Sequence, residues 1–203
     1  MTTALLSTTY FGPIQWYQKL HRYDQVVIDR EERFLKQTYR NRCLIATTQG
    51  VQALTIPVVH DSKSAMGDVL ISDHGNWRHL QWQALQSAYG ESPFFEYYED
   101  DIRPFFSENN WERLMDYNAA ICSTLCSLLD IHPQIAPSTS LDPLTPSDLS
   151  DFRLAINPKH PLPDADFQPR PYYQVYQQKH GFLPNLSVLD LLFNMGPESI
   201  FYL

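Results

Sequence analysis

The chain is poor in glycine and contains none of the glycine-rich loops that cradle phosphates. Its 203 residues include seven glycines, at positions 12, 50, 67, 75, 90, 181 and 196. This spacing rules out both GxGxxG and GxxxxGK[ST]. The chain also lacks the GxSxG elbow of serine hydrolases and the HExxH pair of zinc proteases. The sequence therefore carries no standard dinucleotide, P-loop or hydrolase motif.

Cysteine and closely spaced histidine are scarce as well. The three cysteines, Cys43, Cys122 and Cys126, form no CxxC pair, so we expect buried structural thiols. Cys122 and Cys126 are four residues apart within a predicted helix and would be neighbours on one face. His74 and His79 lie five residues apart, a spacing that does not put two ligands on one helix face. We predict no metal site, and no motif identifies a cofactor.

Positive charge and long apolar runs are also limited. Fifteen lysines and arginines face 23 acidic residues, giving a net charge of -8 and a pI of about 5.2. An acidic chain argues against nucleic acid as a partner. No run reaches the roughly 18 apolar residues of a membrane span. The N-terminus MTTALLSTTYFGP lacks the basic region of a signal peptide, which predicts a cytoplasmic protein.

The first 72 residues alternate between strand and helix patterns. Gly12 and Pro13 break the first strand, and Gly50 supplies the turn between two later strands. The pattern predicts strands at 4–11 and 24–29, a helix at 14–23, two strands within 42–59, and a strand at 69–72.

Helices dominate the next sixty residues. Asn76 is placed to cap a helix that Gly90 ends. A second helix starts at Asn109 or Asn110 and stops near His132, and Pro104 makes one long helix between them unfavourable. Residues 1–132 are therefore predicted to form an α/β core domain, with a mixed sheet, packed helices and a Rossmann-like N-terminus.

The remainder of the chain changes character twice. Residues 133–171 hold nine of the fifteen prolines and predict a long loop or arm. Residues 172–203 are apolar again, with Ser187 and Asp190 resembling a capping box and Gly196 just past the helix end. We expect this C-terminal helix to dock on the core, or on a second subunit, within one domain overall.

Positive charge is concentrated in one short stretch. Five of the fifteen lysines and arginines lie between residues 30 and 42, just after the second predicted strand. Ligands of α/β folds gather at the carboxyl ends of strands, and arginine forks match phosphates and carboxylates. The prediction is that an anionic substrate is held by Lys36, Arg40, Asn41 and Arg42. The alternative is that these side chains form salt bridges with Asp29, Glu31 or the acidic run at 99–101.

A second candidate group is Asp73 with His74, at a predicted strand-to-helix junction. Histidine titrates near neutrality and works as a general base when a carboxylate orients it. We therefore predict His74 as catalytic base and Asp73 as its orienter. The alternative is that Asp73 or Asn76 caps the helix and His74 is a surface residue.

Several segments, taken in order, resemble the WbqC-like protein family. They are YFGPIQWYQKL, the strand ending in Asp29, KQTYRNRCLI, GVQALTIPV, NWRHLQW and AYGESPFFEYY. The likeness covers nearly the first 130 residues, and KHGFLPNLSVLDLLFN resembles one branch of the family. Many relatives have a Gln-Pro pair before the first aromatic and a Gly-Tyr where this chain has Gln15, Trp16 and Tyr17.

This resemblance implies a function that the residues alone do not. Some family members lie among bacterial surface-polysaccharide genes, which implies a cytoplasmic transferase that moves an acyl or aminoacyl group onto a sugar nucleotide. Its partners would be the sugar nucleotide or a thioester donor. The alternative is a non-catalytic binding or scaffold protein, dimeric through its aromatic termini.

Overall fold

The N-terminal strand lies inside a four-stranded parallel sheet with the order β7-β2-β1-β8. Thr3 pairs with Gln25 on one side of β1 and with Leu149 on the other. The strands are β1 (Thr3–Leu6), β2 (Gln25–Ile28), β7 (Ile135–Ala136) and β8 (Leu149–Asp151). Helix α1 (Ile14–Arg22) connects β1 to β2, so the predicted Rossmann-like start is confirmed in the computed structural model. The structure describes residues 2–60, 64–107, 110–136, 138 and 149–203.

Two antiparallel hairpins supply the remaining described strands. Strands β3 (Arg42–Thr47) and β4 (Gly50–Thr55) form the predicted hairpin, and β5 (Val58–Val59) pairs with β6 (Leu70–Ile71). Gly50 has φ of 106°, a conformation that side chains disfavour, which explains glycine at the turn. In this α/β fold, parallel and antiparallel strand pairing thus occur in separate sheets.

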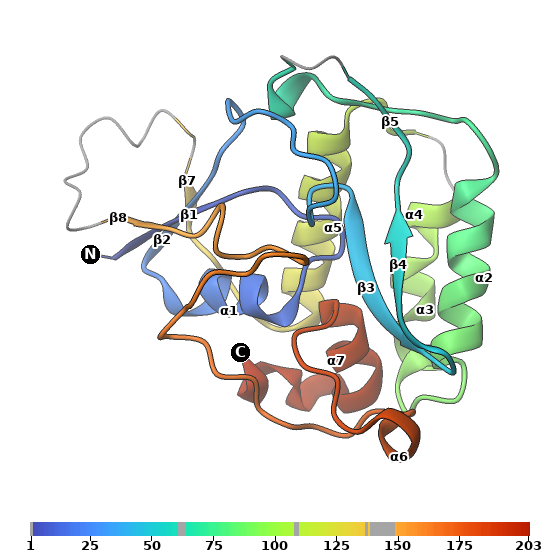
Figure 1. Ribbon diagram of the computed structural model, residues 1–203. Coiled ribbons are helices and arrows are strands. Elements are labelled where there is room, and N and C mark those ends of the chain that lie inside the picture. The colour runs from blue at the N-terminus through green and yellow to red at the C-terminus, as the bar shows by residue number, and fades with distance from the viewer. Residues whose placement is uncertain (1, 61–63, 108–109, 137, 139–148) are drawn as a thin grey trace.

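Further helices pack against the hairpin and against one another (Figure 1). They are α2 (Trp77–Tyr89), α3 (Phe95–Ile102), α4 (Pro104–Ser107), α5 (Leu114–Leu128), α6 (Gln177–His180) and α7 (Val188–Met195), with 3-10 turns at Met66–Asp68 and Gly196–Tyr202. Pro104 separates α3 from α4, as expected for a residue that disfavours helix interiors. Asn76 precedes α2, but its side chain accepts no capping hydrogen bond. Helix α5 begins at Leu114, after Asn110; Asn109 lies outside the described residues.

The first seven of the nine residues of α1 are buried, including the polar residues Gln15, Gln18 and Lys19. The proline-rich span supplies a hydrogen-bond or ion-pair partner to each of them. Lys19 Nζ lies 2.7 Å from the Asp164 carboxylate, and Gln15 donates to the same carboxylate at 2.8 Å. Gln18 donates to the backbone carbonyl of Asp166 at 2.9 Å. The span therefore lies over α1 in this part, and its described residues also supply strands β7 and β8.

The C-terminal helix docks on the core, as predicted. All residues of α7 except its last are buried. Ser187 caps α7 by accepting a hydrogen bond from the Leu189 N–H. The predicted capping box is incomplete, because the Ser187 N–H donates to the Leu44 carbonyl while the Asp190 carboxylate turns inward.

Asp190 instead joins a buried polar network that links the C-terminal segment to α2. Its carboxylate accepts hydrogen bonds from Tyr89 at 2.9 Å, Tyr172 at 2.6 Å and Gln174 at 2.9 Å. Burial raises the pKa of Asp190 above its ordinary value, although the hydrogen bonds oppose this effect. Because buried polar groups need partners, this network fixes how α7 sits against the hairpin and α2.

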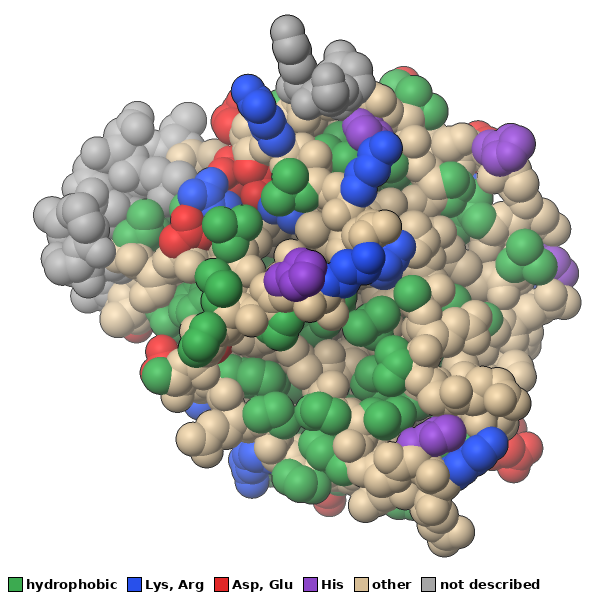
Figure 2. Space-filling model, in the orientation of Figure 1, with side chains coloured by type: hydrophobic (Ala, Val, Ile, Leu, Met, Phe, Trp, Pro, Cys, Tyr) green, Lys and Arg blue, Asp and Glu red, His purple; other side chains and the backbone are tan. Residues whose placement is uncertain are grey.

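The surface carries charges of both signs. Figure 2 shows positive and negative side chains next to one another at the upper left of one face, rather than a uniformly basic area. Among the described residues, no helix combines the length and apolar character needed to cross a bilayer.

Candidate functional site

Polar residues gather where the parallel strands β1, β2 and β8 end. Ser7 follows β1, Asp29 follows β2, and Asp151 is the last residue of β8. Since parallel strands end at the same edge of a sheet, these three side chains lie at one carboxyl edge. This edge is the usual ligand site of open α/β sheets.

The loop after β2 turns sharply and delivers a carboxylate to this edge. Asp29 Oδ1 accepts hydrogen bonds from the N–H groups of Glu31 and Glu32, at 2.9 and 3.2 Å. The turn brings Glu32 next to Arg40, which lies just before β3. The two hydrogen bonds that Asp29 accepts from this backbone therefore position Glu32, the acidic member of the Glu32–Arg40 ion pair.

Arg40 is 3% exposed and makes a two-pronged contact with Glu32. Its Nε lies 2.9 Å from one carboxylate oxygen and its Nη2 lies 2.5 Å from the other. Nη2 also donates to Ser7 Oγ at 2.7 Å. Burial raises the pKa of Glu32 above its ordinary value, although Arg40 acts in the opposite direction.

A second arginine, Arg153, approaches the same edge from the segment after β8. Its Nη1 lies 2.6 Å from Asp29, and its Nε and Nη2 contact Asp151 at 3.0 and 2.7 Å. Burial acts to raise the pKa of Asp151, but hydrogen bonds from Arg153 outweigh it and the pKa lies below its usual range. Both arginines are thus held in fixed positions by carboxylates.

A cavity of about 210 Å³ opens between these two ion-paired groups. Arg33, Arg40 and Arg153 line it together with Glu32 and Asp151, so three cations face two anions. A guanidinium has five N–H donors, and Arg40 and Arg153 each use three of them in the contacts described above. The cavity therefore has a formal excess of positive charge and retains arginine donors.

The structure separates the four residues predicted to hold an anion. Arg40 lines the cavity, whereas Asn41 donates its amide to the Ile56 carbonyl at 2.8 Å. Arg42 donates to Thr55 Oγ1 at 3.1 Å across the hairpin, and Lys36 is exposed. The ligand roles of Lys36, Asn41 and Arg42 stay predictions.

His74 and Asp73 lie in the exposed segment between β6 and α2. Asp73 accepts a bond from Arg78 at 2.8 Å, and the His74 N–H donates to Ser72 Oγ at 3.1 Å. Neither residue lines the cavity that holds Arg40. Their catalytic roles also stay predictions.

Sequence reasoning missed Ser7, Glu32, Asp151 and Arg153 as members of one group. Glu32 stands beside Glu31, one of the acids considered as an arginine partner. Arg153 lies in the span expected to be a loop or arm, where no periodicity marked the three-residue strand before it. Nothing in the sequence around residues 151–153 indicated a strand or a binding residue, because β8 forms only through its long-range pairing with β1.

The fold and this edge together define an α/β protein with a Rossmann-like first unit and an ion-paired cavity at its carboxyl edge. The chain belongs to the WbqC-like protein family, whose model matches residues 8–159 and 164–202. It is 25% identical over 223 aligned positions to "Uncharacterized protein Rv1507c" of Mycobacterium tuberculosis (strain ATCC 25618 / H37Rv), covering 98% of this chain and 96% of that protein. No solved structure matches the chain.

Proposed function

We propose that this WbqC-family protein binds a small anionic molecule at the carboxyl edge of its parallel sheet. One observation carries the proposal: Arg40 and Arg153, far apart in sequence, converge on one cavity together with Arg33. The ion pairs hold the guanidinium groups of Arg40 and Arg153 in place before binding, which lowers the entropic cost of ordering these side chains around an anion. Phosphate and carboxylate are the groups that match the remaining donors.

The finer proposal is that the bound anion is a sugar nucleotide or a thioester donor, and that the protein transfers an acyl or aminoacyl group in surface-polysaccharide biosynthesis. His74 would act as base, with Asp73 as its orienter. Because His74 does not line the cavity, this step requires the substrate to extend from the cavity to the exposed segment before α2. His74→Ala tests this step directly: turnover should fall while ligand affinity and melting temperature stay unchanged.

The second candidate is a non-catalytic binding or scaffold protein, which would be dimeric through its aromatic termini. The closed Arg40–Glu32 and Arg153–Asp151 pairs favour it, because each arginine already has an internal partner. Tyr173 and Phe201, which are 54% and 68% exposed, offer apolar surface for a partner. In this case the arginines stabilise the fold and the cavity holds no ligand.

A thermal-shift screen separates the two candidates. The panel contains sugar nucleotides, free nucleotides, CoA thioesters and amino acids. A ligand at about 100 times its Kd should stabilise the native state by roughly 2.7 kcal/mol. Arg33→Ala removes an exposed cation that lines the cavity, while Arg103→Ala removes an exposed cation at the end of α3 and serves as control.

Anion binding at this edge predicts a shift that weakens in Arg33→Ala and persists in Arg103→Ala. Arg40→Lys, which keeps the charge but loses the fork, should weaken it further. A panel without any hit, or a hit that neither cavity variant affects, would remove the support for this site and favour the scaffold.

A further inference from the structure

The arginine cavity has apolar side chains on its walls as well as charged ones. Leu35 and Leu154 line it together with the three arginines, and they are 43% and 61% exposed. Leu35 lies in the loop after β2 and Leu154 in the turn after β8, so they come from distant parts of the chain. Single exposed leucines are ordinary on a protein surface, but two that converge on one charged cavity indicate the chemistry of a ligand.

The turn that carries Leu154 is held in place by its neighbours. Phe152 and Ile156 on either side are buried, and the Ile156 N–H donates to the Phe152 carbonyl at 3.0 Å. Lys159 Nζ donates to Gln37 Oε1, so the segment after β8 contacts the loop after β2. The two leucines are therefore fixed beside the cavity, and neither belongs to the hydrophobic core cluster.

The charge and the size of the cavity restrict the anion. The lining holds three arginines and two carboxylates, and Asp29, which pairs with Arg153, adds a third carboxylate. The site therefore offers at most one unbalanced positive charge, which matches a carboxylate better than a phosphate dianion, since a buried charge needs a partner. The volume of about 210 Å³ lies below the range of about 300–1,000 Å³ of typical small-molecule sites, so a ligand of few atoms fits best.

We propose that this cavity binds a short aliphatic carboxylate. The three arginines hold the carboxylate group, and Leu35 and Leu154 contact the aliphatic chain. This inference rests on the anion binding proposed above and narrows the anion to one chemical class. An aliphatic carboxylate is also the free form of an acyl group, the kind of group whose transfer is proposed there.

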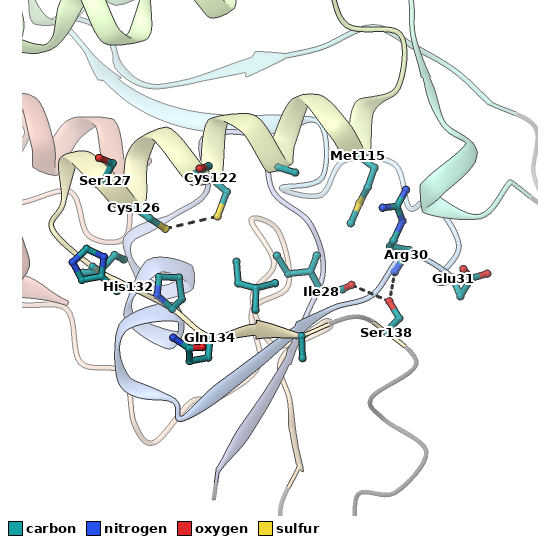
Figure 3. A pocket seen from close by; sticks show the side chains of 16 residues that line it. Ile28, Arg30, Glu31, Met115, Cys122, Cys126, Ser127, His132, Gln134 and Ser138 are labelled. Carbon is teal, nitrogen blue, oxygen red and sulfur yellow. Dashed lines mark hydrogen bonds between the residues drawn. The ribbon is translucent and has the colours of Figure 1, made fainter.

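A second hollow could also take an apolar chain. The groove between α5 and strands β2 and β7 has a volume of about 860 Å³ and largely apolar walls, with α5 on one side and the sheet on the other (Figure 3). Among the described residues that line it, Arg30 is the one lysine or arginine. Arg30 lies 3.8 Å from Asp116, and both side chains are about half exposed. A short carboxylate should therefore prefer the cavity, where three arginines converge.

NMR titration of the isotope-labelled full chain with sodium acetate, propanoate, butanoate and pentanoate, at constant ionic strength, tests the proposal. The Kd should fall by up to about fourfold for each added methylene, the limit for a fully buried group. Butylammonium chloride, which has the chain but the opposite charge, should not bind. Butyl phosphate should bind more weakly than pentanoate, because its second negative charge has no partner.

Variants separate the apolar contact from the charge. Leu35→Ser and Leu154→Ser should each reduce the gain per methylene and leave the Kd of acetate unchanged. Arg33→Ala should instead weaken all four carboxylates by a similar factor. Leu80→Ser, at an exposed leucine of α2, and Ala119→Trp, which fills the groove, are the controls and should change neither quantity.

The outcomes separate the aliphatic chain from the anion site itself. If all four carboxylates bind equally well, but more weakly to Arg33→Ala, the chain assignment is wrong and the anion site stands. If no carboxylate binds, this inference is wrong, and the thermal-shift panel decides whether another anion uses the site. A gain per methylene that both leucine variants keep, or that Ala119→Trp abolishes, would place the chain elsewhere. Tighter binding of butyl phosphate than of pentanoate, or any binding of butylammonium, would contradict the carboxylate.

Discussion

Arg40 is the residue on which the carboxyl edge of the sheet depends. Its guanidinium bonds Glu32 and Ser7, and its backbone carbonyl accepts a hydrogen bond from Asn118 of α5 at 2.8 Å. One residue thus connects β1, the loop after β2 and α5. A buried charge of this kind is stable only while its partner is present.

Arg40→Ala should therefore lower the free energy of unfolding by about 3–5 kcal/mol, because Glu32 stays buried without a counter-ion. Urea denaturation followed by circular dichroism measures the change. Arg103→Ala, at an exposed position, should change stability by less than ~0.5 kcal/mol. Arg40→Met/Glu32→Met removes both charges and should recover much of the loss. A single variant as stable as the wild type would show that the pair is not a buried contact.

Asp164 is a second acidic residue with a buried cationic partner, Lys19 of α1. Burial acts to raise the pKa of this carboxyl, but hydrogen bonds from Lys19 and Gln15 outweigh it, so the pKa lies below its ordinary value. The unfolded chain then takes up its proton more readily than the folded one. The stabilising contribution is present above the unfolded pKa of about 3.9 and is lost as the pH falls through the folded pKa.

Asp164→Asn should accordingly be less stable than the wild type at pH 7, with a gap that narrows below about pH 4. Unfolding free energies measured between pH 7 and pH 2.5 give the comparison. Asp100→Asn is the control, since Asp100 is an exposed carboxylate of α3. A gap of constant size across this range would mean that Asp164 titrates normally in the fold.

Individual site residues were predictable only in part from the sequence. The charge cluster identified Arg40 because five cations in thirteen residues stand out in an acidic chain. Its partner Glu32 did not stand out, since the choice among adjacent acids depends on the turn that Asp29 caps. Arg42 looked equivalent to Arg40 in sequence, yet it points to the hairpin.

At the level of elements, α7 combines a polar cap with complete burial. Ser187 Oγ accepts from the Leu189 N–H and donates to the Phe11 carbonyl at 2.7 Å. The Ser187 side chain thus caps the start of α7 and also holds α7 to the loop that follows β1. Substitution affects both contacts at once.

Ser187→Ala should destabilise the protein by about 1–2 kcal/mol, at the upper end of the range for lost caps. Ser187→Thr keeps the hydroxyl and should retain more of this stability. Thermal unfolding of both variants gives the order, and equal melting temperatures for wild type and Ser187→Ala would contradict the capping role.

Long, strongly patterned elements were the predictable ones. Helices α1, α2 and α7 and the β3–β4 hairpin follow their apolar spacing and glycine signals. Strands β7 and β8 span two and three residues, too few to show a period. They form because β1 and β2 offer unpaired edges, a tertiary effect that no local pattern reports.

At the scale of the whole molecule, the core is shared between distant parts of the chain. Residues of α1, β3, α2, α5 and α7 belong to one hydrophobic cluster. The β8 strand completes the sheet beside β1. The division into a core of 1–132, an arm of 133–171 and a docked segment of 172–203, all within one domain, stays a prediction.

A fragment of residues 1–132 should therefore fail to unfold cooperatively, since it loses α7 and one neighbour of β1. Calorimetry of the fragment beside the full chain makes the comparison. A sharp transition in the fragment would instead show that residues 1–132 are an autonomous domain.

The position of β1 has a consequence for synthesis on the ribosome. Residues 3–6 leave the ribosome long before residues 149–151, which form their second sheet neighbour. At about 5–20 residues per second, one edge of β1 waits roughly 7–30 s for that partner. Throughout this interval the backbone N–H and C=O groups along one edge of β1 lack their native partner, so pairing with other extended segments competes with folding.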